Sequence, residues 1–280
     1  MRHFTTADGA RIAYADEGAG RPLVLLHGLM AHKGFFARQA ELADTFRLIS
    51  VDLRGHGDSR ADGTALTSIA QLARDVSDLA DALELEDAIG IGWSLGASVL
   101  WRVLTGPAAP RFAGAVVVDM TARVMNDESW TLGLTPDACD ARSAAMRDNF
   151  ANFSSAAGQN IFAQPVTAER REIADWASAE FARNDPAMIG AIWASLMAED
   201  FRPTLRRIQH PTLIVHGAHS QLYGAGTAEH LAETLPDARI VRFDQSGHAP
   251  QLEQPELFNQ ILRDFAAGLP RTRQVEETNS

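Results

Sequence analysis

The chain has 280 residues, a formal net charge of −11 at pH 7 and one cysteine. Its length is sufficient for one large α/β domain, and its acidic balance, without Arg or Lys clustered on one helix face, excludes nucleic acid as an expected partner. One cysteine permits neither an intrachain disulfide nor a cysteine metal site, and no segment resembles a secretory signal or a membrane span, so we expect a cytoplasmic protein without a membrane partner.

The first predicted element is a hairpin, because Asp8-Gly9 separates two alternating segments at residues 3–6 and 11–16. Short apolar runs follow, typical of strands buried on both faces of a parallel sheet. They occupy residues 23–26, 48–51, 88–91, 115–118, 212–215 and 240–243. Helical patterns lie between or after them, at residues 69–83, 94–104, 225–235 and 255–269. The alternation predicts a doubly wound, mostly parallel α/β sheet, whose ligands bind beyond the carboxyl ends of the strands.

The alternation lapses over residues 121–203, which have a helical composition and many aromatic side chains. Because this segment begins at a strand end, on the ligand side of the sheet, we interpret it as a helical cap over the site. The alternative is a set of ordinary helices packed elsewhere. We therefore expect a core formed by residues 1–120 and 204–270, a cap at 121–203, and a disordered, apolar-poor tail at 271–280.

A serine flanked by glycines, Gly92-Trp93-Ser94-Leu95-Gly96, follows the third of these apolar runs. We expect a strand, a sharp turn and a helix here, with glycines at the two flanking positions because side chains there would collide across the turn. The helix that starts behind Ser94 directs unpaired N–H groups towards negative charge developing beside the hydroxyl. Asp119 and His248 follow two other predicted strands, so all three side chains are expected at one edge of the sheet.

These motifs resemble those of the α/β-hydrolase fold family, serine hydrolase branch with a helical cap, over nearly the whole chain. The resemblance is carried, in the family's order and spacing, by His27-Gly28, Gly55-His56-Gly57-Asp58-Ser59, Gly92-Trp93-Ser94-Leu95-Gly96 and Gly247-His248. It implies Ser94 as nucleophile, His248 as base, and an oxyanion hole formed by the backbone N–H groups of Leu29 and Leu95. It also implies that His27 and Gly28, together with Asp52, brace the loops around that hole.

The acid of the triad departs from the family's usual pattern. Many relatives have an Asp where this chain has Ser220, and no acidic residue lies between positions 216 and 229. A triad histidine needs a carboxylate to fix its tautomer, so we expect Asp119, at the end of the neighbouring strand, to be a displaced acid. The alternatives are that Asp119 caps the next helix, or that His248 works in a dyad with Ser220 or water.

Other candidates complete the expected site. Trp93, Met120 and Trp130 are candidate pocket residues. His216 and His219 lack a third ligand near them in the sequence, so we expect no metal, and no motif implies a cofactor.

The sequence thus predicts a serine hydrolase, carboxylesterase-like, that cleaves a small or medium uncharged, apolar ester or lactone through an acyl-enzyme. Its activity should fall on acidification, because only a neutral imidazole can accept the serine proton. Two alternatives use the same fold. One is a C–C bond hydrolase or a cofactor-free perhydrolase of the haloperoxidase kind, and the other is a ligand-sensing receptor with little turnover.

Overall fold

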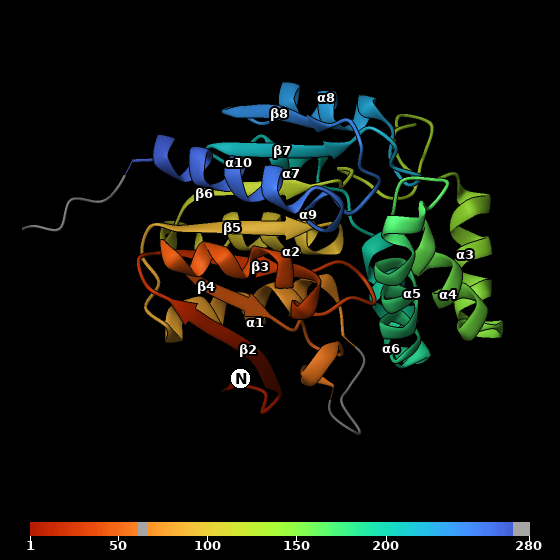
Figure 1. Ribbon diagram of the computed structural model, residues 1–280, viewed down its shortest axis with the longest axis horizontal. Coiled ribbons are helices and arrows are strands. Elements are labelled where there is room, and N and C mark those ends of the chain that lie inside the picture. Colours follow the sequence, from red (N-terminus) through yellow and green to blue (C-terminus); the bar gives the residue numbers. More distant parts are fainter. Residues whose placement is uncertain (61–66, 271–280) are drawn as a thin grey trace, which may run out of the picture.

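The computed structural model describes residues 1–60 and 67–270, so the tail expected at 271–280 lies outside the described residues. The described strands form one sheet in the order β1-β2-β4-β3-β5-β6-β7-β8 (Figure 1). In chain order they are β1 (Arg2–Thr5), β2 (Arg11–Gly18), β3 (Arg21–Leu26), β4 (Phe46–Val51), β5 (Ala88–Trp93), β6 (Phe112–Val118), β7 (Thr212–Gly217) and β8 (Ala238–Phe243).

The sheet is mostly parallel, as the sequence predicts. The hairpin of β1 and β2 turns at Asp8-Gly9, where Gly9 has a φ of 85°, and β2 pairs antiparallel with β4. From β4 to β8 every neighbouring pair is parallel. The carboxyl ends of β3, β5, β6 and β7 therefore meet at one edge, which is where a doubly wound sheet binds its ligands.

The expectation that every parallel strand is buried on both faces is wrong for β8. This strand is the last in the sheet order, and the Ile240 side chain at its centre is 40% exposed. By contrast β3, β5 and β7 are buried along their whole lengths. An edge strand has one neighbour and incomplete helix cover, so an apolar run alone does not show that a strand is central.

Helices cover both faces of the sheet, with η1 and α10 on the near face and α1, α2 and α8 on the far face of Figure 1. The predicted helical segments agree with α1, α2, α8 and α10 to within one residue at each end, whereas η1 was not predicted. The elements outside residues 121–203 are η1 (Lys33–Asp44), η2 (Gly57–Ser59), α1 (Ile69–Ala82), α2 (Leu95–Leu104), η3 (Ala109–Arg111), α8 (Ala225–Thr234), α9 (Pro250–Glu253) and α10 (Pro255–Gly268), and α7 (Arg202–Leu205) begins at the end of that segment.

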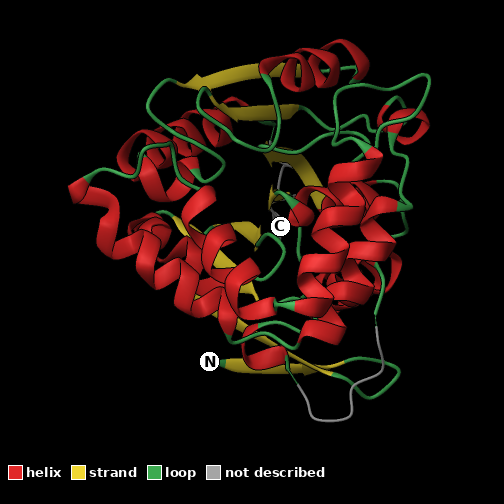
Figure 2. Ribbon diagram, turned by 90° about the vertical axis from the view of Figure 1, so that its right-hand side faces the viewer, coloured by secondary structure: helices red, strands yellow, loops and turns green. Residues whose placement is uncertain are grey.

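Four helices lie between β6 and β7 in the sequence: α3 (Pro136–Asp148), α4 (Phe150–Asn160), α5 (Ala168–Ala182) and α6 (Pro186–Met197). They stand together beside the carboxyl ends of the strands (Figure 1), and Figure 2 views the molecule from their side. Gly158 lets α4 approach α5 closely, since a Cβ there would lie 2.4 Å from the backbone of Ser178. Within the described residues, no helix combines the length and apolarity needed to cross a bilayer.

Candidate active site

Ser94 lies at the sharp turn between β5 and α2, with φ 53° and ψ −119°. This strained conformation is possible because the turn is flanked by glycines. A Cβ on Gly92 would lie 2.6 Å from the backbone of Ala97, and a Cβ on Gly96 would lie 2.1 Å from the carbonyl oxygen of Leu26. The turn presents Ser94 to a cavity at the strand ends.

Asp119 follows β6 at a φ of 46° and is buried in contact with three polar side chains. Its Oδ2 lies 2.6 Å from Nδ1 of His248 and accepts a 2.6 Å hydrogen bond from the Ser220 hydroxyl. Its Oδ1 lies 3.0 Å from Nδ1 of His216. The alternative role for Asp119, that of a cap on the next helix, is not observed. The next helix is α3, and the Thr135 side chain caps it.

The pKa of Asp119 is the balance of two opposing causes. Burial raises the pKa of this carboxyl, but the hydrogen bonds from His216, His248 and Ser220 favour the charged form and hold the pKa below its usual value. A carboxylate that stays ionised beside Nδ1 of His248 keeps the proton on that nitrogen. Nε2 of His248 is then free to accept a proton from another group.

His216 is the residue that sequence reasoning missed. In the sequence His216 is a candidate only as a metal ligand, yet it contacts the same carboxylate as His248. The signal was its position at the end of β7, beside β6, which carries Asp119. In the parts of the chain that the structure describes, no group of three or more His, Cys, Asp or Glu side chains is placed to hold a metal ion.

The loop after β3 is held by His27. Its Nε2 accepts a 3.0 Å hydrogen bond from the backbone N–H of Leu53, and its Nδ1 lies 2.8 Å from the carbonyl oxygen of Gly28. Burial lowers the pKa of His27 well below its usual value, so the ring is neutral. A Cβ on Gly28 would lie 3.3 Å from Cβ of Ser94, which leaves little room for any other residue.

Two backbone N–H groups lie beside Ser94. Leu95 is the first residue of α2, so its N–H has no partner within the helix. Leu29 follows Gly28 and lines the same cavity as Ser94. The N–H of Leu95 is thus at the start of the helix that follows Ser94, and the N–H of Leu29 is on the loop after β3 that borders the same cavity.

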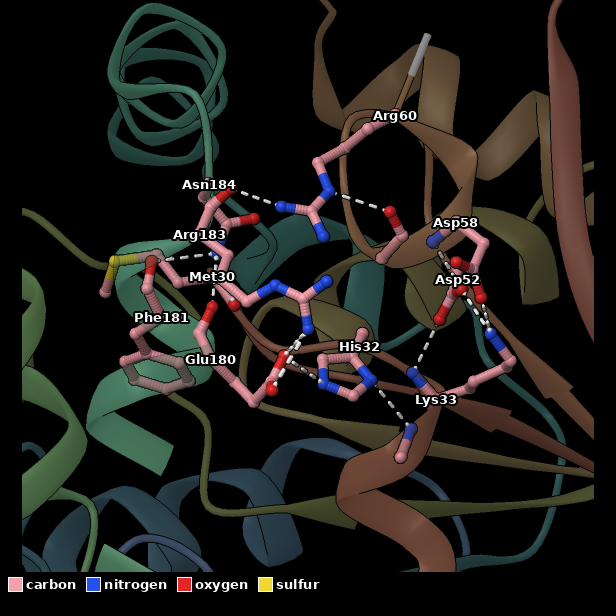
Figure 3. Close-up of polar contacts among 12 residues, drawn as sticks. Met30, His32, Lys33, Asp52, Asp58, Arg60, Glu180, Phe181, Arg183 and Asn184 are labelled. Carbon is pink, nitrogen blue, oxygen red and sulfur yellow. Dashed lines mark hydrogen bonds and ion pairs between the residues drawn. The ribbon is translucent and has the colours of Figure 1, made fainter. Parts of the chain in front are cut away.

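Polar contacts attach the loop after Leu29 to the helices beyond β6 (Figure 3). Asn184, just after α5, donates a 2.7 Å hydrogen bond from Nδ2 to the carbonyl oxygen of Met30. Nε2 of His32 lies 3.2 Å from Oε2 of Glu180 on α5. The position of α5 is therefore coupled to the loop that carries Leu29.

A second set of contacts in Figure 3 fixes the base of this loop. Asp52 is buried and accepts hydrogen bonds from the backbone and the ammonium group of Lys33, at 2.7 and 2.6 Å. The same ammonium group lies 2.6 Å from Asp58. Asp52 therefore has a bracing role in the loop and does not reach the cavity.

The cavity has a volume of about 350 Å³ and lies between the strand ends and α3 to α6. Trp93 lines it, and its Nε1 donates a 2.7 Å hydrogen bond to the carbonyl oxygen of His248. The lining residues are Gly28, Leu29, Met30, Trp93, Ser94, Leu134, Ala141, Arg142, Ala145, Met146, Phe153, Ala156, Ala157, Asn160, Ile161, Phe181, Trp193, Leu196, Leu222, Tyr223 and His248.

Two expected pocket residues do not line this cavity. Trp130 packs edge-on against His230, and its Nε1 donates a hydrogen bond to the carbonyl oxygen of Arg123. Met120 borders a separate small void beside Ile214. Both follow β6 in the sequence, but of the residues between β6 and α3 it is Leu134 that lines the cavity.

The arrangement of Ser94, His248 and Asp119 at the ends of β5 to β8 can be compared with known proteins. A family model described as the alpha/beta hydrolase family matches residues 23–261. The chain belongs to the alpha/beta hydrolase family. The resemblance to this family that the sequence motifs indicate is thus confirmed.

The hydrolase is 31% identical over 256 residues to a pimeloyl-[acyl-carrier protein] methyl ester esterase of Nitrosomonas europaea, a match that covers 89% of this chain and 97% of that one. It is 30% identical to a non-heme chloroperoxidase of Streptomyces lividans, with coverage of 95% and 99%. Among solved structures, an esterase from Exiguobacterium antarcticum superposes with a TM-score of 0.88 at 25% identity, over 95% of this chain and 99% of that chain.

Proposed function

We propose that this hydrolase is a serine carboxylic ester hydrolase that acts on small or medium esters or lactones. The observation that carries the proposal is the 2.6 Å contact between buried Asp119 and His248, since His248 shares a cavity with Ser94. The esterase relatives support the reaction class. Cys139, the one cysteine, is a free buried thiol, which is compatible with the cytoplasmic location that we propose.

The proposed reaction uses five groups. The Ser94 hydroxyl attacks the carbonyl carbon while Nε2 of His248 takes its proton, and Asp119 stabilises the resulting imidazolium. The backbone N–H groups of Leu29 and Leu95 hold the negative oxygen of the tetrahedral intermediate. The imidazolium then protonates the departing alcohol, and a water molecule activated by His248 hydrolyses the acyl-enzyme and regenerates the serine.

We propose that the chain divides into a core, residues 1–120 and 204–270, and a helical cap at 121–203. The cavity supports this division, because its walls come from the strand-end loops on one side and from α3, α4, α5 and α6 on the other. Most side chains contributed by the helices are apolar, which supports an aliphatic or aromatic group in the bound ester.

The test is steady-state hydrolysis of p-nitrophenyl esters of increasing acyl length. Ser94→Ala should lower kcat by roughly 10⁴-fold or more, because the nucleophile is lost and the remaining groups supply limited catalysis. Ser98→Ala, on the same helix and buried, is the matched control and should keep the activity. Equal activity in wild type and Ser94→Ala would refute the proposal. No turnover of any ester, with tight binding of a ligand, would favour a receptor.

A perhydrolase activity is the second candidate, and the chloroperoxidase relative favours it. In this reaction hydrogen peroxide replaces water as the nucleophile that attacks the acyl-enzyme, which yields a peracid and free Ser94. Acetate, hydrogen peroxide and a halogenation indicator test it directly. Indicator colour that depends on Ser94 supports the activity, and equal colour with Ser94→Ala argues against it.

A further inference from the structure

One cationic side chain lies in the wall of the cavity. Arg142 is on α3, on the same helix face as Ala145 and Met146, which also line the cavity. Among the lining residues that the structure describes, it alone carries a permanent positive charge, and none is an Asp or Glu. The cavity is therefore apolar over most of its wall and positive at one place.

Within residues 1–60 and 67–270, no hydrogen bond or ion pair is formed by the Arg142 guanidinium. Two other arginines of the helices between β6 and β7 are paired: Arg147 contacts Asp148, and Arg183 contacts Glu180. The chain has 36 acidic residues against 25 basic ones, so carboxylates are plentiful. Arg142 is half-buried where it lines the cavity, so a bound anion can replace part of the water around its guanidinium and pair with its charge.

The charge of Arg142 acts on the part of the cavity that contains the candidate catalytic residues. Tyr223 lines the same cavity as Arg142, and the positive charge of Arg142 opposes the rise that burial causes in the pKa of Tyr223. The ring of Tyr223 in turn lies 6.0 Å from the ring of His248, centre to centre. Ligand groups that contact Arg142 and His248 can therefore belong to one small molecule.

We propose that Arg142 binds a carboxylate of the substrate, so that the preferred substrates are half-esters of short dicarboxylic acids or lactones that carry a carboxylate. The inference rests on the proposed ester hydrolysis and refines the uncharged substrate expected from the sequence. Guanidinium groups bind carboxylates through two parallel hydrogen bonds, which fix both the position and the orientation of the bound group.

A carboxylate is favoured over a phosphate by charge and by volume. One guanidinium balances one negative charge, whereas a phosphate monoester carries nearly two at neutral pH and would leave the excess against apolar side chains. The cavity of about 350 Å³ also suits a short chain with a small terminal group.

The experiment compares two esters of equal acyl length, mono-p-nitrophenyl adipate with a free carboxylate and p-nitrophenyl methyl adipate without one. Arg142→Gln should lower kcat/KM for the charged ester by about 10- to 100-fold and change the neutral ester by less than about 3-fold. Arg142→Lys should retain part of the preference. Arg147→Gln is the matched control, because it removes the same charge from an exposed position on the same helix.

Binding to Ser94→Ala separates this inference from the proposed reaction. Calorimetry with monomethyl adipate and dimethyl adipate should show tighter binding of the charged ester, lost when Arg142→Gln is added. That result with no ester turnover in wild type would keep the carboxylate site and refute the hydrolysis. Ester turnover that depends on Ser94, with a charged-to-neutral ratio unchanged by Arg142→Gln, would overturn the carboxylate site, and so would Arg142-dependent competition by inorganic phosphate but not by adipate.

Discussion

Replacement of Asp119 by Asn tests the displaced acid with almost no change in shape. The carboxylate accepts contacts from His248 and Ser220 on Oδ2 and from His216 on Oδ1. An asparagine offers one acceptor oxygen and one donor nitrogen, so it cannot accept from both histidines. If its amide nitrogen faces His248, Nδ1 of that ring becomes the acceptor and Nε2 carries the proton, which is the wrong tautomer for a base.

The expected loss in kcat is about 10⁴-fold, which corresponds to about 5.5 kcal/mol of transition-state stabilisation. The fold should survive, because the backbone N–H of Asp119 still donates to the carbonyl oxygen of Val215 and the side-chain volume is kept. The assay is kcat for p-nitrophenyl butyrate, with the free energy of unfolding in urea as the measure of folding. A kcat within about 10-fold of wild type would refute Asp119 as the acid.

A second substitution, Ser220→Asp, can return a carboxylate to the neighbourhood of His248. The Ser220 hydroxyl lies 2.6 Å from the same Oδ2 that contacts His248, so a carboxylate at position 220 is within reach of that ring. Asp119→Asn with Ser220→Asp should therefore recover at least about 10-fold of the lost kcat. Recovery in the double variant together with a large loss in Asp119→Asn cannot be explained by misfolding of the single variant.

Three further predictions follow from buried groups. His216→Ala leaves Oδ1 of Asp119 without its contact and should lower kcat by about 10-fold with little change in KM, measured on the same ester. Gly96→Ala should cost about 3 kcal/mol or more in urea unfolding, whereas Gly190→Ala, with open space at its Cβ, should be neutral or stabilising. Burial lowers the pKa of His56 to about 4, so its stabilising effect is present above about pH 6.5 and is lost as the pH falls towards 4. Between about pH 7 and 5 the free energy of unfolding should fall by about 2 kcal/mol more in wild type than in His56→Gln, measured in urea, and equal falls would contradict the prediction.

The order of the strand ends was predictable from the sequence, because continuous apolar runs and sharp glycine turns have few alternative structures. Gly92 and Gly96 show this best. A Cβ at either position would lie too close to backbone atoms across the turn, so only glycine fits there. The exposure of β8 was not predictable, because it depends on the order of strands in the sheet. A run such as residues 240–243 has the same pattern at the edge as in the centre.

The walls of the cavity depend on how the inserted helices pack, which the sequence pattern does not specify. The mixed polar and apolar spacing of α3 does not show which face points inward, so Arg142 gave no signal as a cavity residue. The sequence makes Trp130 a candidate pocket residue, yet it packs against His230 outside the cavity. His216 needed a tertiary contact, because its partner Asp119 lies on a different strand.

The position of the proposed acid, Asp119, follows from the pairing of β6 with β7. These strands are neighbours in register, with Val118 opposite Val215, so residues just beyond their ends lie close together. A carboxylate can therefore reach His248 from either strand end. Here it comes from β6, where Asp119 has a positive φ, and the place after β7 is occupied by a hydrogen-bond donor. Ser220 is such a donor, and its hydrogen bond strengthens the preference of Asp119 for the charged state. A hydroxyl at position 220 thus supports the acid instead of replacing it, so Ser220→Ala should weaken activity while leaving the triad in place.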